Sequence, residues 1–237
     1  MAIKKNDFIE IEYTGIVTEA KAVFDTTDEK IAKDCGIYSK KTAYGPLIVC
    51  VGENQLIPGL DKEIPGKEAG KEYTVSLKAE DAFGKKDIKL LKMIPVNVFK
   101  KQEINPMPGL EVNIDGAYGL IKNVSGGRTV VDFNHPLAGK DITYKVKINR
   151  LITNANQKLQ SFLSMGLGVK SEAIKSSFDG QKMTVVLPMA LPKEATDGLS
   201  EKLKEVIPEI KEIVFTAEPK EAKGPKAEAE KKSEPTQ

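Results

Sequence analysis

The sequence of 237 residues contains no tryptophan, only one histidine and two cysteines. Because zinc sites combine several Cys and His ligands, and because Cys35 and Cys50 stand apart, a zinc site and a disulfide framework are both poorly supported. A catalytic Ser-His-Asp arrangement would have to use His135. Neither a P-loop sequence nor a Gly-x-Gly-x-x-Gly sequence after a strand is present. We therefore expect an activity that needs no metal, nucleotide or other cofactor.

The chain also lacks an excess of charge of either sign and any long apolar run. Its 36 basic and 34 acidic residues leave a net charge of +2, which argues against a surface for nucleic acids. No stretch reaches the roughly 18 consecutive apolar residues that a membrane-spanning helix needs. The first residues, MAIKKND, show no apolar signal region. We expect a cytoplasmic protein that binds neither nucleic acid nor membranes.

The end of the chain differs in composition from the rest. Residues 218–237 consist mainly of Lys, Glu, Ala and Pro and contain no aromatic residue. Such a segment cannot bury enough apolar area to offset the entropy lost on ordering. The composition predicts a disordered tail, and a charged arm that binds a partner is the alternative.

The first half has the pattern of a small antiparallel sheet. Apolar and polar residues alternate in three segments, and a fourth is a short apolar run, so all four are expected to be strands. These strands are residues 8–14, 47–51, 73–77 and 141–151. Pro58 suits the first turn of a short helix in residues 54–61, and the polar segment 27–44 is expected to be a loop or bulge. Short strands with one helix indicate an α+β fold.

Residues 87–131 have the pattern of a separate small unit. Asp115-Gly116 and Gly126-Gly127 are turn signals between short apolar runs, which predicts a β meander. The unit is also rich in apolar residues, namely Leu91, Met93, Ile94, Val98, Phe99, Met107 and Leu110. They could form the core of the unit, or some could stay exposed and hold unfolded chains. We favour exposure, because so small a meander cannot hide them all and exposed apolar patches usually bind something.

Residues 154–217 alternate between helical and strand patterns. Asn154 and Thr196 are expected helix N-caps. Asp179-Gly180 marks a hairpin, and residues 213–215 predict a last strand. An α+β domain of about 60 residues is marginally stable alone, which favours docking or self-association.

Several motifs of the first half resemble, in order and near spacing, those of the FK506-binding protein (FKBP) family of peptidyl-prolyl cis-trans isomerases. They are IEYTG at 11–15, VFDTT at 23–27, VGENQLIPGL at 51–60 and DAFG at 81–84. A further motif, NHPLAGK at 134–140, closes the insertion that follows Gly84. The insertion after Gly84 resembles the SlyD branch, in which an "insert-in-flap" chaperone domain interrupts the loop over the active site. The added C-terminal domain resembles the long, archaeal-type members.

The resemblance implies an FKBP antiparallel sheet wrapped on a short helix, with an inserted small β-rich domain and a small α+β C-terminal domain. The FKBP isomerase domain would be residues 1–86 plus 132–153, and the insert-in-flap chaperone domain residues 87–131. The C-terminal domain would be residues 154–217, followed by the disordered tail.

The resemblance also implies which residues form the isomerase pocket. Asp25 would lie near the carbonyl group before the proline, held by a hydrogen bond from Tyr13. The backbone N–H of Ile57 would hold the peptide, and Leu60 would lie beneath the proline ring. The implied catalytic residues are Tyr13, Asp25, Ile57, Phe83 and Tyr144, and the implied substrate-binding residues are Phe24, Leu47, Val49, Leu56, Leu60 and Leu137.

Three features depart from the family pattern. Leu60 stands where many members have Trp, and Phe83 stands where they have Tyr. Both changes weaken the expectation of tight macrolide binding more than that of isomerisation. The tail lacks the His and Cys residues of SlyD metal-binding tails, so we expect no nickel-binding role.

We therefore expect a peptidyl-prolyl cis-trans isomerase that accelerates folding and binds unfolded or X–Pro-containing polypeptides through its inserted domain. The C-terminal domain is expected to form a homodimer. Two alternatives stay open. One is a holdase in which the changes at positions 60 and 83 have silenced catalysis, and the other is a hydrolase that uses His135.

Overall fold

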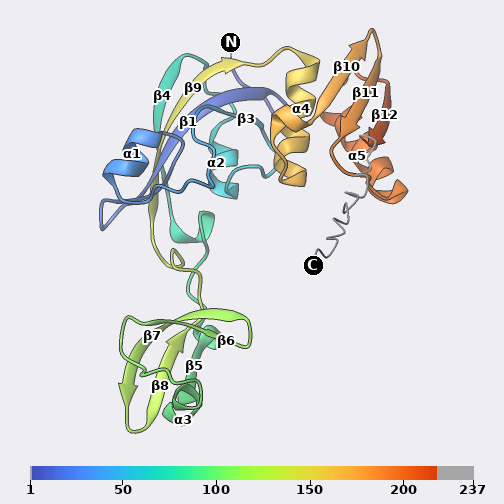
Figure 1. Ribbon diagram of the computed structural model, residues 1–237. Helices are drawn as coiled ribbons and strands as arrows, with labels where there is room; N and C mark the ends of the chain where they lie inside the picture. The colour runs from blue at the N-terminus through green and yellow to red at the C-terminus, as the bar shows by residue number, and fades with distance from the viewer. Residues whose placement is uncertain (1, 218–237) are drawn as a thin grey trace, which may run out of the picture.

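The computed structural model describes residues 2–217, so the predicted tail lies outside the described residues. Figure 1 shows a central body, an extension joined to it by a narrow neck, and a third part beside the body. Each part has its own sheet, and there are three apolar clusters, of which the one in the third part also includes residues of the body. Within the described residues, no helix is long and apolar enough to cross a membrane.

The body is a five-stranded antiparallel sheet in which β2, β1, β9 and β4 lie in that order and β3 also pairs with β1. Its elements are β1 (Phe8–Val17), β2 (Ala22–Thr26), β3 (Leu47–Cys50), α2 (Pro58–Glu63), β4 (Lys71–Leu77), the 3-10 turn Ala79–Asp81 and β9 (Ile142–Leu151). Leu60 and Ile64, on and just after α2, pack with the inward residues of the strands in one core. The α+β class and its antiparallel sheet are confirmed.

The segment 27–44, expected to be a loop or bulge, contains a helix, α1 (Glu29–Asp34). The Asp28 side chain caps it by accepting hydrogen bonds from the backbone N–H groups of Lys30 and Ile31. Ala32 is completely buried. The expectation was wrong because six residues with one buried side chain give too weak a periodic signal, and the cap stabilises the turn instead.

The extension contains a four-stranded sheet in the order β5-β8-β7-β6. Its elements are the 3-10 turn Ile88–Leu90, β5 (Leu91–Pro95), α3 (Val96–Lys100), β6 (Glu111–Ile114), β7 (Ala117–Ser125) and β8 (Arg128–Asp132). The meander at β6, β7 and β8 follows the predicted turns. β5 and α3 were not predicted, because apolar residues run through both without one clear period.

The third part begins with α4 (Ala155–Leu167), which Asn154 caps as predicted by accepting a hydrogen bond from the backbone N–H of Gln157. The other elements are the 3-10 turn Ser171–Ala173, β10 (Lys175–Asp179), β11 (Lys182–Leu187), α5 (Lys193–Val206) and β12 (Glu212–Ala217), which is parallel to β11. The prediction that Thr196 caps a helix was wrong. α5 begins three residues earlier, after Pro192, and the Thr196 hydroxyl donates to the Lys193 carbonyl inside the helix.

The third part packs on the body through a shared apolar cluster. Phe8 of β1 and Cys50 of β3 are each 1% exposed and lie in the same cluster as Leu159 and Leu163 of α4. Burial raises the pKa of the Cys50 thiol to about 12. Both cysteines are free, as expected, with Cys35 exposed and Cys50 buried. The third part therefore covers the β3 edge of the body sheet.

Candidate active site

Three neighbouring strands bring chemically different residues to one row of the body sheet. Gly15 of β1 lies opposite Asp25 on β2 and opposite Tyr144 on β9. A Cβ atom at Gly15 would lie 2.6 Å from Cζ of Phe24 and 3.0 Å from Cε1 of Tyr144. Only glycine therefore lets both rings lie across β1, and a glycine inside a strand is the sequence signal for such a close approach.

A β-bulge explains why Phe24 and Asp25 are both available at this site. The register between β1 and β2 shifts after Gly15, so that Ile16 pairs with Val23 and Phe24 has no opposite residue. Such a bulge bends the strand and redirects side chains, and it is common beside active sites. Phe24 is half-buried and Asp25 is exposed.

The rings form a continuous aromatic group, defined here as Tyr13, Phe24, Phe83 and Tyr144. Phe24 contacts Phe83 and Tyr144 edge-to-face, with centroid separations of 5.6 and 5.8 Å, and Tyr13 contacts Tyr144 at 5.8 Å. Edge-to-face packing suits the quadrupoles of aromatic rings. The site is thus an apolar surface with fixed ring orientations.

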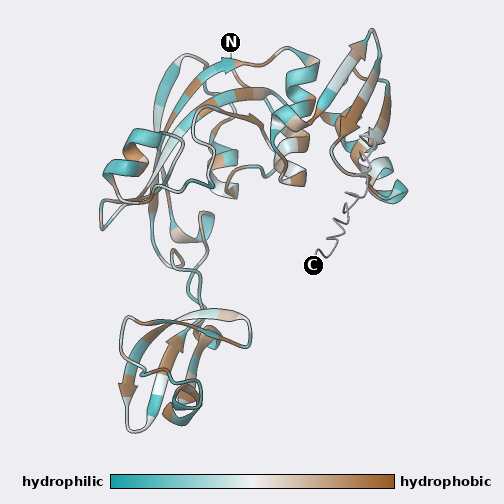
Figure 2. Ribbon diagram, viewed as in Figure 1, coloured by the Kyte–Doolittle hydropathy of each residue, from teal (hydrophilic) through white to brown (hydrophobic). Residues whose placement is uncertain are grey.

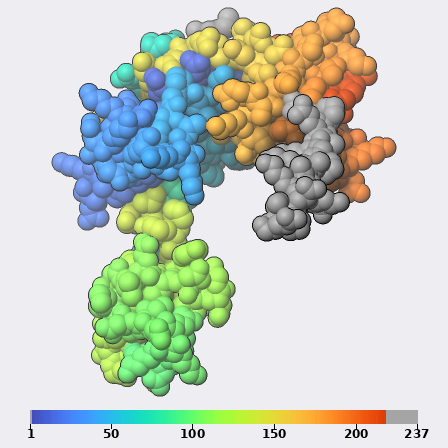
Figure 3. All heavy atoms as spheres, viewed as in Figure 1, coloured from blue at the N-terminus to red at the C-terminus, as the bar shows by residue number. Residues whose placement is uncertain are grey.

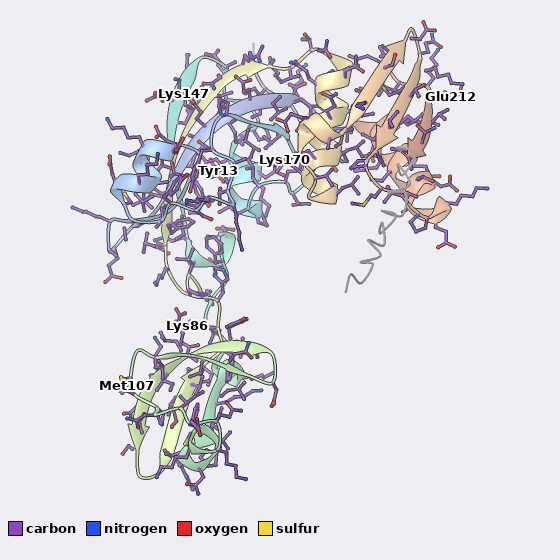
Figure 4. The ribbon with its side chains drawn as sticks, viewed as in Figure 1. Tyr13, Lys86, Met107, Lys147, Lys170 and Glu212 are labelled. Atoms are coloured by element: carbon purple, nitrogen blue, oxygen red, sulfur yellow. The ribbon has the colours of Figure 1, made fainter. Side chains whose placement is uncertain are left out.

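A hydrogen bond places a carboxylate at the rim of the aromatic group. The Tyr13 hydroxyl donates to Oδ2 of Asp25 at 2.9 Å, as the resemblance implies. Burial, and then the negative charge of Asp25, raise the pKa of Tyr13 well above its usual range, and burial likewise raises the pKa of Tyr144. Both phenols therefore keep their protons at neutral pH, and Tyr13 can continue to orient Asp25. Figure 4 shows Tyr13 in the body.

The turn that leads to Ile57 is held by three side chains. The buried Asp61 carboxylate of α2 accepts hydrogen bonds from the backbone N–H groups of Gly52 and Asn54, at 2.9 and 3.0 Å. Lys202 of α5 forms an ion pair with Glu53 at 2.9 Å. The third part of the molecule thus helps to fix the active-site turn, a link that the sequence did not reveal.

Helix α2 approaches the segment before Phe83 very closely. A Cβ atom at Gly59 would lie 2.4 Å from the carbonyl oxygen of Asp81. Glycine at this position therefore allows α2 and the segment before Phe83 to lie this close together. The sequence motif contained Gly59, but nothing in the pattern showed its contact.

The remaining predicted pocket residues divide into two groups by burial. Leu47, Leu56, Ile57 and Leu137 are half-buried and pack against the same body core as the rings of the aromatic group. Val49 and Leu60 are each 1% exposed. These two are therefore residues of the body core and contribute almost nothing to the accessible surface of the site.

His135 extends the aromatic group toward the neck. Its ring stacks on Phe83 with a centroid separation of 4.9 Å and an interplanar angle of 2°. Its Nδ1 atom accepts a hydrogen bond from the backbone N–H of Leu137. Among the described residues, no serine or cysteine side chain is hydrogen-bonded to His135, so the structure gives no support to the hydrolase alternative.

The predicted chaperone surface requires one clear correction. Phe99 is 1% exposed and forms the core of the extension with Val112, Ile121 and Val131. Helix α3 turns the Phe99 side chain toward the core. The sequence does not reveal this, because the apolar residues around Phe99 follow neither a helical nor a strand period. Ile94, Val98 and Leu110 are half-buried, whereas Leu91, Met93 and Met107 are 39%, 66% and 52% exposed.

Three further apolar side chains of the extension are exposed but were not predicted. Ile88 and Tyr118 are 81% and 78% exposed, and Leu90 is 38% exposed. Figure 2 shows apolar residues along several strands of the extension, and Figure 4 labels Met107 there. The set that stays exposed, called the extension patch below, is Ile88, Leu90, Leu91, Met93, Met107 and Tyr118.

Within residues 2–217, no three or more His, Cys, Asp or Glu side chains are grouped so that they could hold a metal ion.

Two family models match the chain. The model described as FKBP-type peptidyl-prolyl cis-trans isomerase matches residues 1–102, and the model described as FKBP26, IF domain, matches residues 92–137. The second match falls mainly on the extension.

Curated relatives point in the same direction. A short-type peptidyl-prolyl cis-trans isomerase from Methanocaldococcus jannaschii is 33% identical over 146 residues, which are 62% of this chain and 92% of the relative. A probable FKBP-type 16 kDa peptidyl-prolyl cis-trans isomerase from Pseudomonas fluorescens is 32% identical over 44% of this chain and 71% of the relative. The SlyD isomerase of Vibrio cholerae is 35% identical over 49% of this chain, but the match spans only 59% of that relative.

Proposed function

Because the chain belongs to the FKBP-type peptidyl-prolyl cis-trans isomerases, we propose that it is a folding isomerase whose inserted extension also holds unfolded polypeptides. The observation that carries the catalytic part is the aromatic group with the Tyr13–Asp25 hydrogen bond at its rim. The observation that carries the chaperone part is the extension patch.

The reaction needs a site that stabilises a twisted amide. Rotation about an X–Pro bond has a barrier of about 18–20 kcal/mol, because resonance keeps the amide planar. Water stabilises the separated charges of the planar form. In our proposal the half-buried rings of Phe24 and Phe83, backed by the buried ring of Tyr144, replace that water around the proline. This weakens the planar form relative to the twisted one. No nucleophile and no cofactor take part.

Asp25 supplies the fixed polar group of this mechanism. Tyr13 holds its carboxylate at 2.9 Å, so little reorganisation is needed when the amide twists. Fixed groups of this kind stabilise a transition state more than mobile solvent does. The backbone N–H of Ile57 would hold the peptide, since Asp61 fixes the turn before it.

The extension would capture clients in two ways. Its exposed side chains offer apolar contact, and β5 and β6 are the edge strands of its sheet, to which an extended chain can add. Figure 3 shows that the extension stands away from the body, so a client can reach it without contacting the third part. A client held there raises the local concentration of its X–Pro bonds at the pocket.

Three further proposals concern the cellular location, the family branch and the oligomeric state of the protein. We propose that it works in the cytoplasm, as a long archaeal-type member of its family. We also propose that it forms a homodimer through the third part, whose three-stranded sheet has β10 and β12 as its edge strands. A dimer would present two extension patches to one client.

Replacing Met93 and Met107 together by glutamate is expected to lower the protection of an unfolded client at least threefold, because the variant places charges at two exposed apolar positions of the extension patch. Light scattering of citrate synthase aggregating at high temperature measures this protection. Met189→Glu is the matched control, since Met189 is also exposed, at 47%, but lies in the third part. Equal loss in the control, or no loss in the double variant, would argue against the extension patch.

A further inference from the structure

A cavity lies at the neck, where the extension joins the body. It has a volume of about 410 Å³, within the range of ligand-binding pockets. The extension supplies Glu111, Tyr118, Gly119, Leu120 and Lys122 to its wall. The end of β8 supplies Asp132, and the segments that connect the two parts supply Lys86, Asn134, His135, Pro136 and Lys140. Figure 4 shows Lys86 at this neck.

The cavity borders the candidate active site. His135 lines the cavity and stacks on Phe83, which belongs to the aromatic group. A single ring thus separates the two spaces. Because an extended chain advances about 3.3–3.6 Å per residue, a peptide with its proline against Phe83 reaches the cavity within a few residues.

A polar network holds the two connecting segments together. Asn134 exchanges hydrogen bonds with the backbone of Asp87 in the opposite segment and also donates to Asp132. Lys86 pairs with Asp132 at 3.2 Å, and Asp132 is only 6% exposed. Burial raises the pKa of Asp132, but the hydrogen bonds from Asn134 and Lys86 outweigh it and keep that pKa below its usual range. The walls of the cavity are therefore formed before any client arrives.

The charges around the cavity favour the binding of an acidic side chain. Lys86 is already neutralised by Asp132. Lys122 and Lys140 are exposed lining residues, and within residues 2–217 neither has an acidic side chain in ion-pair distance. Two carboxylates line the cavity, Asp132 and Glu111. Asp132 is paired with Lys86, so only Glu111 opposes the positive charge of the two lysines. Tyr118, which is 78% exposed, adds an apolar surface beside the two lysines.

We propose that this neck cavity is a second subsite for the client chain and that it selects clients with an acidic side chain a few residues from the isomerising proline. The inference rests on the isomerase function proposed above. Lys122 and Lys140 are its specificity-determining residues. They act on the client outside the aromatic group and take no part in the twisting of the amide.

The test uses the full chain and pairs of synthetic peptides with one X–Pro bond. In each pair a single Glu, or a Gln in its place, stands two to six residues from the proline on one side or the other. At one or more positions the wild type should show about threefold higher kcat/KM for the Glu peptide, as expected for an exposed ion pair. The difference should lie in KM and should shrink as salt is added.

Two variants decide the source of that preference. In Lys122→Met/Lys140→Met the Glu-to-Gln ratio should fall to one, while kcat/KM for the Gln peptides stays at the wild-type value. Lys101→Met, which removes an exposed lysine elsewhere on the extension, should keep the preference. A ratio of one at every position in the wild type, or an unchanged ratio in the double variant, would overturn the inference.

Failure of this subsite is distinguishable from failure of the isomerase function. If the wild type accelerates the Gln peptides but shows no Glu preference, the subsite is absent and the isomerase remains. If it accelerates neither peptide, the isomerase function fails. In that case, calorimetric Kd values for the Glu and Gln peptides test the subsite. Equal Kd values for the two peptides reject it. Tighter binding of the Glu peptide that is lost in the double variant supports it.

Discussion

Replacing Asp25 by alanine is expected to lower kcat/KM for a short X–Pro peptide by about 10- to 100-fold. The variant removes the fixed carboxylate at the rim of the aromatic group, and the loss of one preorganised polar contact in an active site costs about this much or more. Asp25 is exposed and lies at a sheet edge, so the fold should survive. Thermal unfolding of the variant checks this point.

Tyr13→Phe separates the carboxylate from the hydrogen bond that orients it. This variant keeps Asp25 and the ring of residue 13 but loses the 2.9 Å hydrogen bond. We expect a smaller loss, about three- to tenfold. Asp34→Ala is the matched control, because it removes an exposed carboxylate at the end of α1 that has no hydrogen bond to Tyr13. Wild-type kcat/KM in Asp25→Ala would show that this carboxylate has no role in the reaction.

Replacing residues 87–131 by a short Gly/Ser linker is expected to separate the two substrate classes. Catalysis of proline-limited refolding of an unfolded protein should fall about 100-fold, because the increase in local concentration at the pocket is lost. Activity on a short peptide should fall less than threefold. The body should still fold, since its apolar cluster contains no residue of the extension.

Refolding kinetics and a peptide assay on the same protein samples measure the two losses. The unfolding temperature of the shortened chain shows whether the body is intact. An equal loss on both substrates would contradict the division of roles between the extension and the body.

The secondary structure of the body was largely predictable because its strands face a core on one side. β1 and β9 alternate between apolar and polar residues over most of their length, and the structure buries the apolar set. The Asn154 cap was also predictable, because its signal is local. Helices α1 and α3 were missed, since each has a single buried side chain and no periodic stripe.

The contacts that organise the site were much less accessible from the sequence. The motif that contains Gly15 was recognised, but nothing local shows that two rings meet above it. The stacking of His135 on Phe83 and the ion pair of Lys202 with Glu53 join residues 52 and 149 positions apart in the chain. Such contacts depend on how distant segments meet, which a local pattern does not encode. The same reason explains the error at Phe99.

The most direct test of the account is the rate at which a short X–Pro peptide exchanges between its cis and trans forms at equilibrium. Magnetisation-exchange NMR measures this rate with the wild-type chain at about one-fiftieth of the peptide concentration. Uncatalysed exchange takes tens of seconds or more at 25 °C, so the account predicts exchange cross-peaks that appear only when the protein is present. Peptide binding with no increase in the exchange rate would contradict it, and would indicate a chaperone that only holds its clients.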